Sequence, residues 1–387
     1  MEIGQYIDTI DDAVKCSILS LNDIEIDDYN GEGCNGYVFF GNHKVFRRRV
    51  AVKYYYYGEN THEEVSLINQ ISNPNILKVW DAHTIEDGWA YFITDEQRNG
   101  NIDNLLSNNR IDTNTSLHII RGVLSGVGAL HAEPNFLLHC DLKPANILID
   151  NNMSPIIADF GSIKRMPENG TEIIASQHSP LYRPPESYDG GIYNYTSDIY
   201  QIGILFYQLL GGYLPYEATS YMTKAQLKDH LAIQDRYEQS KFEGNCLFDR
   251  AKKEKLLNLS TLPAYVDKRI LQIIRKATKA LPSERFTNIA DFRLALHRIG
   301  SIPNWTTDGE VILCKSKNDS YQIIKNQQNQ YVIEKKYSDN RWSKLRNSPP
   351  FDSKSQAIEY LQEVLLLFPR KREIKGKVKE MGLLRGE

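Results

Sequence analysis

Hydrophobic and polar positions alternate through the first third of the chain and then change to a three-to-four spacing. From residue 24 to 56, β-branched and aromatic residues alternate with polar ones, which predicts strands. Two further strands are predicted at 76–80 and 89–94. Helical spacing begins near residue 101 and is clear at 101–108 and 115–131. A strand-rich part followed by a helix-rich part predicts an α+β fold.

Helical periodicity also precedes the strands and extends the helical part. Residues 3–18 predict an amphipathic helix that packs against the strand-rich part, with partner binding as the alternative. Further helices are predicted at 224–237, 266–280 and 289–299. The polar stretch 218–262 is interpreted as either a solvated insertion or a substrate-docking surface.

The last part of the chain changes pattern again. Three alternating runs, at 311–315, 321–325 and 331–336, predict strands separated by polar turns. A helix with Ser353 as its N-cap is predicted at 353–368, so this part is a small sheet with one helix and a charged tail.

Length and charge divide the chain into three predicted parts. These are an N-terminal helical extension at 1–23, a main domain at 24–300 and a small separable C-terminal α/β domain at 301–387. The C-terminal part holds 16 Lys and Arg against 11 Asp and Glu, a net charge of +5, whereas the rest of the chain carries −8. Charge asymmetry of this kind supports separate domains.

Overall composition is typical of a soluble globular protein outside membranes. The net charge of −3 does not favour nucleic acid as a partner. No apolar run reaches the roughly 18 to 20 residues of a membrane helix, and the acidic N-terminus does not have the layout of a secretory signal. Five scattered cysteines without a CxxC pair favour neither disulfides nor zinc, which predicts a cytoplasmic location.

The strongest chemical signal is the stretch 139–161, HCDLKPANILIDNNMSPIIADFG. Its two apolar runs flank a polar turn, which predicts a hairpin that brings Asn146 and Asp159 side by side. Amide and carboxylate oxygens are ligands that suit Mg²⁺. Asp141 would then lie nearby, free to accept a proton from an alcohol.

This stretch closely resembles the catalytic and metal-binding segment of the eukaryotic-type serine/threonine protein kinases, His-Arg-Asp-Leu-Lys-Pro-x-Asn followed by Asp-Phe-Gly. The resemblance implies that Asp141 accepts the substrate proton, that Lys143 neutralises the transferred phosphoryl group, and that Asn146 and Asp159 bind Mg²⁺. Cys140 departs from the pattern, because most of the family has arginine there.

The resemblance extends to a nucleotide site in the strand-rich part. Gly31, Gly33 and Gly36 lie between two predicted strands, as in the phosphate-covering loop of kinases, whereas dinucleotide-binding folds have a helix after such a loop. Lys53 ends a predicted Val-Ala-Val-Lys strand. The resemblance implies that this lysine binds the ATP phosphates and is held in place by Glu64. The implied adenine pocket consists of Thr94 at its back, the backbone of Asp95 to Gln97, and the apolar residues Val38, Ala51 and Leu148.

Residues 159–186 resemble an activation segment. The candidate phosphorylation or regulatory hydroxyls within it are Thr171, Ser176 and Ser179. The resemblance also implies three structural residues, Glu186, Arg285 and Asp198, of which the first two form an ion pair and the third holds the catalytic-loop backbone.

Over residues 24–300 the sequence therefore resembles a two-lobed kinase, with a β-rich N-lobe and a helical C-lobe. The implied activity is transfer of the γ-phosphoryl group of ATP, with Mg²⁺, to serine or threonine hydroxyls of protein substrates. The alternatives are a small-molecule kinase of the aminoglycoside phosphotransferase type and a pseudokinase scaffold. The C-terminal domain would recruit a partner or substrate, inhibit the kinase, or bind nucleic acid, which its modest charge favours least.

Overall fold

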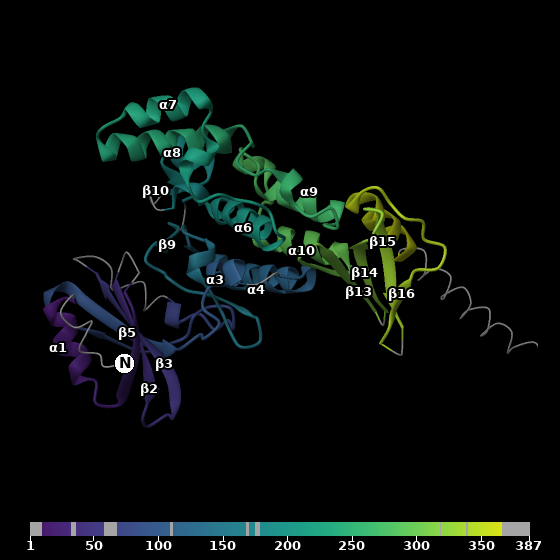
Figure 1. Cartoon of the computed structure of the whole chain (residues 1–387). Coiled ribbons are helices and arrows are strands. Elements are labelled where there is room, and N and C mark those ends of the chain that lie inside the picture. The colour runs from purple at the N-terminus through teal and green to yellow at the C-terminus, as the bar shows by residue number, and fades with distance from the viewer. Residues whose placement is uncertain are drawn as a thin grey trace, which may run out of the picture. The chain divides into compact units, whose positions relative to one another are not determined.

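The computed structural model describes residues 10–31, 36–57, 68–108, 111–167, 170–174, 179–317, 319–337 and 340–365 (Figure 1). The chain divides into two compact units. The first comprises Met1–Leu105, Ile119–Ile202 and Ala280–Ala290, and the second comprises Leu106–His118, Gly203–Lys279 and Asp291–Glu387. None of the helices in the described ranges is long and apolar enough to cross a membrane.

A five-stranded antiparallel sheet with the order β1-β2-β3-β5-β4 forms the first part of unit 1. The strands are β1 (Ile24–Asn30), β2 (Gly36–His43), β3 (Arg48–Tyr56), β4 (Val79–Thr84) and β5 (Trp89–Asp95). The predicted strands are confirmed, except that β4 begins three residues later than expected. The preceding Ile76 and Leu77 instead pair with Ile157, whose carbonyl accepts a hydrogen bond from the Leu77 N–H at 2.9 Å.

The two faces of this sheet have different partners. Phe39, Val52 and Tyr54 are fully buried in a core with Val14 and Ile18, which lie on α1 (Asp12–Ser20). The predicted N-terminal helix is thus confirmed from Asp12 onward. Ile10 and Asp11 precede it, because Asp11 is its N-cap, and residues 3–9 lie outside the described residues. Because successive side chains of a strand point to opposite faces, positions 38, 51 and 53 lie on the face away from α1.

Helices and short paired strands make up the rest of unit 1, and two of the helices continue into unit 2. The helices are α3 (Ile102–Asn108), α4 (Thr113–His131), α5 (Pro185–Asp189) and α6 (Tyr195–Leu209). The strand pairs are β6 (Leu137–Leu138) with β9 (Lys164–Arg165), β7 (Ile147–Ile149) with β8 (Pro155–Ile157), and β10 (Ile173–Ile174) with β11 (Ile192–Tyr193).

Unit 2 shows that the helix predicted at 224–237 is two helices. They are α7 (Lys224–Ala232) and α8 (Arg236–Lys252). Asp235 caps the second helix, since its side chain accepts a hydrogen bond from the Glu238 N–H at 2.9 Å. The cap begins a new helix where the sequence periodicity alone indicated one continuous helix. The other predicted helices are confirmed as α9 (Lys268–Ala277) and α10 (Ile289–Ile299).

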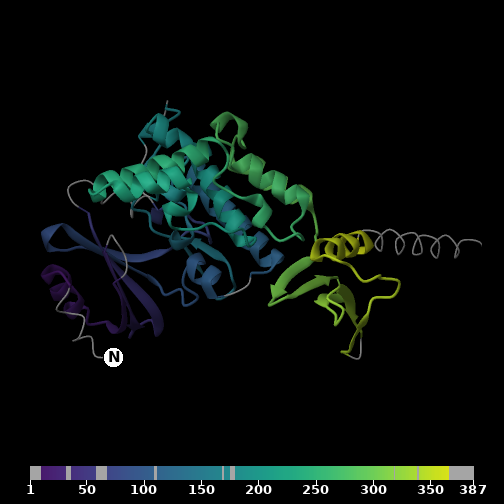
Figure 2. The same cartoon turned by 45° about the horizontal axis from the view of Figure 1, so that its top comes forward.

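The C-terminal part of unit 2 is a five-stranded antiparallel sheet and one helix, at 354–365 (Figure 2). Its strands are β12 (Asn304–Asp308), β13 (Val311–Ser316), β14 (Asp319–Lys325), β15 (Tyr331–Lys336) and β16 (Trp342–Lys344). The three predicted strands are confirmed, but the two edge strands were missed. Ser353 is the predicted N-cap, and its hydroxyl accepts a hydrogen bond from the Gln356 N–H at 3.3 Å.

Candidate active site

The predicted catalytic hairpin is confirmed. In β7 and β8, Ile147 pairs with Ile157, and the next N–H, of Ala158, donates to the Asn146 carbonyl at 2.9 Å. The pairing places Asn146 and Asp159 at the same open end of the hairpin. Both side chains therefore come from a short, hydrogen-bonded element rather than from separate loops.

Lys53 reaches this end of the hairpin from β3. Its Nζ lies 3.0 Å from Asp159 Oδ1, which joins the sheet to the hairpin by an ion pair. Burial acts to raise the pKa of Asp159, but the Lys53 ammonium outweighs it, and the pKa lies below the ordinary value for an aspartate. The carboxylate is therefore charged at neutral pH. Glu64, the predicted partner of Lys53, lies outside the described residues.

Asp141 is nearly inaccessible and is held by two neighbours. Lys143 Nζ lies 2.8 Å from Asp141 Oδ2, and the Asn146 side-chain amide donates to the same oxygen at 3.0 Å. The other oxygen, Oδ1, is buried and has no hydrogen-bond partner among the described residues. A buried acceptor without a donor is costly, so this oxygen keeps a hydrogen-bonding capacity that no described residue uses.

The residues at the hairpin end suit a hard cation. The amide nitrogen of Asn146 is engaged by Asp141, which leaves its oxygen available as a ligand beside the Asp159 carboxylate. No cluster of three or more His, Cys, Asp or Glu residues that could hold an ion occurs in the described ranges. Two protein oxygens suit Mg²⁺, which takes its other ligands from water and phosphate.

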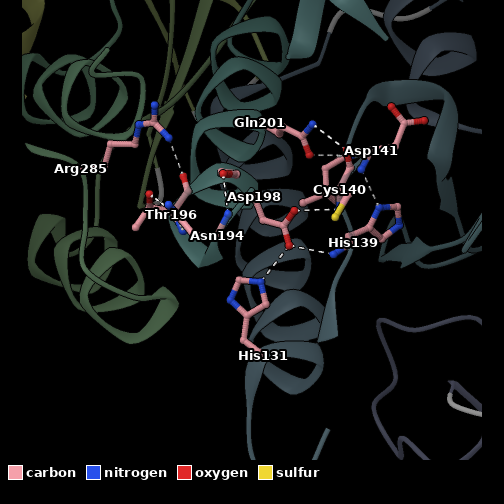
Figure 3. Close-up of polar contacts among 11 residues, drawn as sticks. His131, His139, Cys140, Asp141, Asn194, Thr196, Asp198, Gln201 and Arg285 are labelled. Carbon is pink, nitrogen blue, oxygen red and sulfur yellow. Dashed lines mark hydrogen bonds and ion pairs between the residues drawn. The ribbon is translucent and has the colours of Figure 1, made fainter. Parts of the chain in front are cut away.

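A buried carboxylate fixes the backbone that carries Asp141 (Figure 3). Asp198 Oδ2 accepts hydrogen bonds from the His139 N–H at 2.9 Å and from His131 Nε2 at 2.8 Å. Its Oδ1 accepts from the Cys140 N–H at 3.0 Å. Burial acts to raise the pKa of Asp198, yet these donors hold it below the ordinary value. The strain of a positive φ at Cys140, 66°, is thereby offset.

Gln201, one helical turn after Asp198 on α6, holds the next residues of the same loop. Its Oε1 accepts from the Leu142 N–H at 2.9 Å, and its Nε2 donates to the Cys140 carbonyl at 3.2 Å. Sequence reasoning missed both Gln201 and His131. The i+3 spacing from Asp198 could have identified the glutamine, whereas nothing in the sequence distinguished the histidine.

The structure places four of the predicted nucleotide-site residues, Val38, Ala51, Lys53 and Thr94, on one face of the unit 1 sheet. Ala51 pairs with Thr94, which puts both on the same face as Lys53. Thr94 is buried, and its hydroxyl donates to the Lys78 carbonyl at 2.8 Å. Leu148 forms an isolated β-bridge with Asn101, four residues after Gln97. The chain just after the residues proposed to bind the base therefore lies next to the catalytic hairpin.

The other predicted nucleotide-site residues lie on or next to strands β1, β2 and β5. Val38 is half-buried on the same face as Ala51, and Asp95 forms an ion pair with Arg48 at 3.1 Å. Gly36 has a φ of +147°, and a Cβ there would come within 1.9 Å of the Tyr54 carbonyl, so only glycine suits this position. Gly31 directly follows β1, the Gln97 side-chain amide donates to the Asp95 carbonyl at 3.4 Å, and Gly33 lies outside the described residues.

The activation segment is attached at both ends. Ser179 Oγ accepts a hydrogen bond from Lys143 Nζ at 2.7 Å, beside Asp141. Glu186 and Arg285 form a two-bonded ion pair, at 2.7 and 2.8 Å, and the arginine side chain is fully buried. Thr171 is exposed, and Ser176 lies outside the described residues.

The sequence matches the protein kinase domain over residues 25–297. The chain belongs to this family, and an antiparallel N-terminal sheet followed by a helical part is the two-lobed fold of the family. Members of the family use ATP and a divalent cation.

Individual relatives are protein kinases with modest identity. Serine/threonine-protein kinase SIK1 of Mus musculus is 29% identical over 205 residues, which cover 51% of this chain and 26% of the relative. Dual specificity protein kinase shkB of Dictyostelium discoideum is 32% identical over 199 residues, 48% of this chain and 30% of the relative. Probable serine/threonine-protein kinase MARK-C of the same organism is 28% identical over 224 residues, 55% and 29% respectively. The matches thus span less than a third of each relative's length.

Proposed function

We propose that this chain is a protein kinase that transfers the γ-phosphoryl group of ATP to serine or threonine hydroxyls of proteins. One observation carries the proposal. Lys53, Asp159 and Asn146 converge at the end of one hairpin, beside a buried Asp141 oxygen that lacks a donor among the described residues. A cation site, a phosphate-binding lysine and a proton acceptor are the parts that phosphoryl transfer to an alcohol requires.

Each polar residue of the site has a distinct proposed role. When bound, ATP supplies the phosphoryl group, and Mg²⁺ neutralises the negative charge that develops on it. Asp159 and Asn146 hold the cation, and Lys53, with Glu64 as its proposed orienting partner, steadies the phosphates. Asp141 Oδ1 accepts the hydrogen of the incoming hydroxyl, and Lys143 fixes Asp141 while its charge faces the transferred group.

The proposed nucleotide site follows the face of the sheet that carries Lys53. The glycines Gly31, Gly33 and Gly36 cover the phosphates, and Thr94 limits the depth of the adenine pocket. Backbone groups from Asp95 to Gln97 bind the base edge. The apolar residues that contact the base are Val38, Ala51 and Leu148.

Two further proposals concern location and recruitment. The four cysteines in the described ranges, Cys16, Cys140, Cys246 and Cys314, are free thiols, which supports a cytoplasmic location. The C-terminal domain at 301–387 is proposed to recruit a protein partner or substrate. Its sheet and helix form a small core of their own, built on Ile312, Ile323 and Leu361.

The decisive experiment is transfer of labelled γ-phosphate from ATP by the full chain to a panel of proteins and of aminoglycosides. Asp141→Asn should lower protein phosphorylation by about 10²- to 10⁴-fold, because a general base contributes that much. Asp87→Asn, an exposed aspartate between β4 and β5, is the matched control and should keep the wild-type rate. A wild-type rate in Asp141→Asn, or transfer to aminoglycosides alone, would contradict the proposal.

A further inference from the structure

Arg183 lies on a segment that begins beside the proposed base. Ser179 accepts a hydrogen bond from Lys143 at 2.7 Å, and Lys143 in turn donates to Asp141 at 2.8 Å. A residue of an extended peptide spans about 3.3 to 3.6 Å. The neighbours of a hydroxyl residue placed at Asp141 therefore come within reach of the segment from Ser179 to Arg183.

This segment is preorganised. Pro180–Tyr182 forms a 3₁₀ turn in which Leu181 and Tyr182 are buried, and the Tyr188 hydroxyl donates to the Pro180 carbonyl at 2.9 Å. Two prolines follow Arg183 and restrict the backbone further. A side chain presented from this segment thus loses little conformational freedom when it binds a ligand.

The Arg183 guanidinium is held on two sides and open on a third. Its Nε donates to Ser187 Oγ at 2.9 Å, and its Nη2 donates to the Ser187 carbonyl at 3.0 Å. Its Cζ lies 4.2 Å from the centre of the Tyr188 ring. The third nitrogen, Nη1, donates to no group among the described residues.

Arg183 also lacks an anionic partner within the described part of the chain, because no carboxylate there lies within 4 Å of it. By contrast, Arg285 pairs with Glu186 in the same region. Burial raises the pKa of the neighbouring Tyr193 phenol, and the positive charge of Arg183 opposes that rise.

We propose that Arg183 selects protein substrates that carry an anionic side chain, a carboxylate or a phosphate, beside the hydroxyl to be phosphorylated. The inference rests on the proposed kinase function and adds a substrate class to it. A half-buried guanidinium forms short, charge-assisted hydrogen bonds with carboxylates and phosphates. The Nη1 atom of Arg183 is available for such a bond, because it donates to no other group among the described residues. A substrate with an uncharged residue beside its acceptor hydroxyl would leave Arg183 Nη1 without an anionic acceptor.

The test uses the full chain and a set of serine peptides with aspartate, asparagine, phosphoserine or lysine at each position flanking the acceptor. For wild type, the best aspartate peptide should exceed its asparagine counterpart at least tenfold in kcat/KM, about 1.4 kcal/mol of barrier. The difference should lie mainly in KM, since the contact is made in the ground state as well. Phosphoserine in place of aspartate shows whether phosphate or carboxylate is preferred.

Variants assign the preference to the residue. In Arg183→Leu the ratio of aspartate to asparagine peptides should fall to about one, and in Arg183→Glu the lysine peptide should become the better substrate. Arg293→Leu, an exposed arginine on α10, should keep the wild-type ratio, and thermal melts of all variants verify folding. A wild-type ratio near one, or an unchanged ratio in the folded Arg183 variants, would overturn the inference alone. Failure of the wild type to phosphorylate any peptide or protein would overturn the proposed function and this inference with it.

Discussion

At the scale of single residues, the site depends on charged side chains that are held close to each other and are only partly exposed to water. Asp159 should be the most sensitive of them. Asp159→Asn removes a cation ligand and the partner of Lys53 while keeping the side-chain volume, so no cavity opens. We expect loss of phosphoryl transfer by at least about 10³-fold, about 4 kcal/mol of barrier, with a nearly unchanged melting temperature. Full activity at ordinary Mg²⁺ would contradict the cation site.

Asp198 provides a prediction about pH. Its folded pKa is below the ordinary value, so its stabilising effect is present above the unfolded pKa of about 3.9 and is lost as the pH falls through the folded pKa. Asp198→Asn should lower the free energy of unfolding near neutral pH by about 3 kcal/mol or more, because two loop N–H groups and His131 lose a charged acceptor.

The measurement is denaturant unfolding of wild type and Asp198→Asn from pH 7 down to the acid limit of folding. The difference between them should shrink toward the acid end, where the wild-type carboxylate becomes protonated. A difference that stays constant over the whole range would show that charge is not the source of the stabilisation.

The sequence was informative about residues whose spacing is local. Asn146 and Asp159 flank the two strands of one hairpin, so two apolar runs around a polar turn predicted their proximity. Contacts between distant segments were not visible in the pattern. His131, Gln201 and the Lys143–Ser179 bond depend on how helices and loops pack, and no local periodicity encodes that packing.

At the scale of elements, the activation segment is held by strand pairing and an apolar cluster. Strand β9 pairs with β6, and β10 pairs with β11. Between them, Cys140 is packed with Leu138, Met166 and Tyr193 in a fully buried group. Burial raises the pKa of the Cys140 thiol well above its ordinary value, so it remains a neutral packing group rather than a reactive one. In this cluster cysteine takes the position where most kinases have arginine.

This arrangement predicts activity that does not require phosphorylation of the activation segment. A cysteine cannot form the charge-assisted bonds that an arginine makes with a phosphate, and strand pairing already holds the segment at 164–165 and 173–174. Phosphatase treatment of wild type, and the double change Thr171→Ala with Ser176→Ala, should each change the initial rate by less than about threefold, under 0.7 kcal/mol of barrier. A loss of ten-fold or more in either sample would show that phosphorylation switches the enzyme on.

Some helix and strand boundaries could not be predicted from the periodicity of the sequence. Helical spacing predicted α10 over its full length, because its apolar face is continuous. It did not separate α7 from α8, since the break depends on the Asp235 cap. The edge strands β12 and β16 were missed because they are short and mostly polar, and their pairing with β13 and β15 supplies the hydrogen bonds that define them.

At the scale of the whole molecule, charge and periodicity predicted a C-terminal domain that can be separated from the kinase. Within unit 2, however, that domain is attached by specific contacts. Trp305 on β12 is almost fully buried and stacks on Tyr265 with ring centroids 5.6 Å apart and planes within 2°. The Thr113 hydroxyl donates to the Trp305 carbonyl at 3.2 Å, and Asn304 Oδ1 accepts from the Asn114 N–H at 2.9 Å. Asn304 thus satisfies one of the free N–H groups at the start of α4.

These contacts predict that removal of the domain destabilises the remaining chain even though the domain has its own core. Trp305→Ala should lower the free energy of unfolding by about 3 to 5 kcal/mol, the range for deletion of a buried aromatic side chain. Trp342→Ala, at a half-buried position on the edge strand β16, is the control and should cost clearly less. A chain that ends at residue 300 should melt below the full-length protein, because Tyr265 and the start of α4 lose their partners. Equal melting temperatures for the truncated and full chains, with equal rates on a generic peptide, would show instead that the two parts are energetically independent.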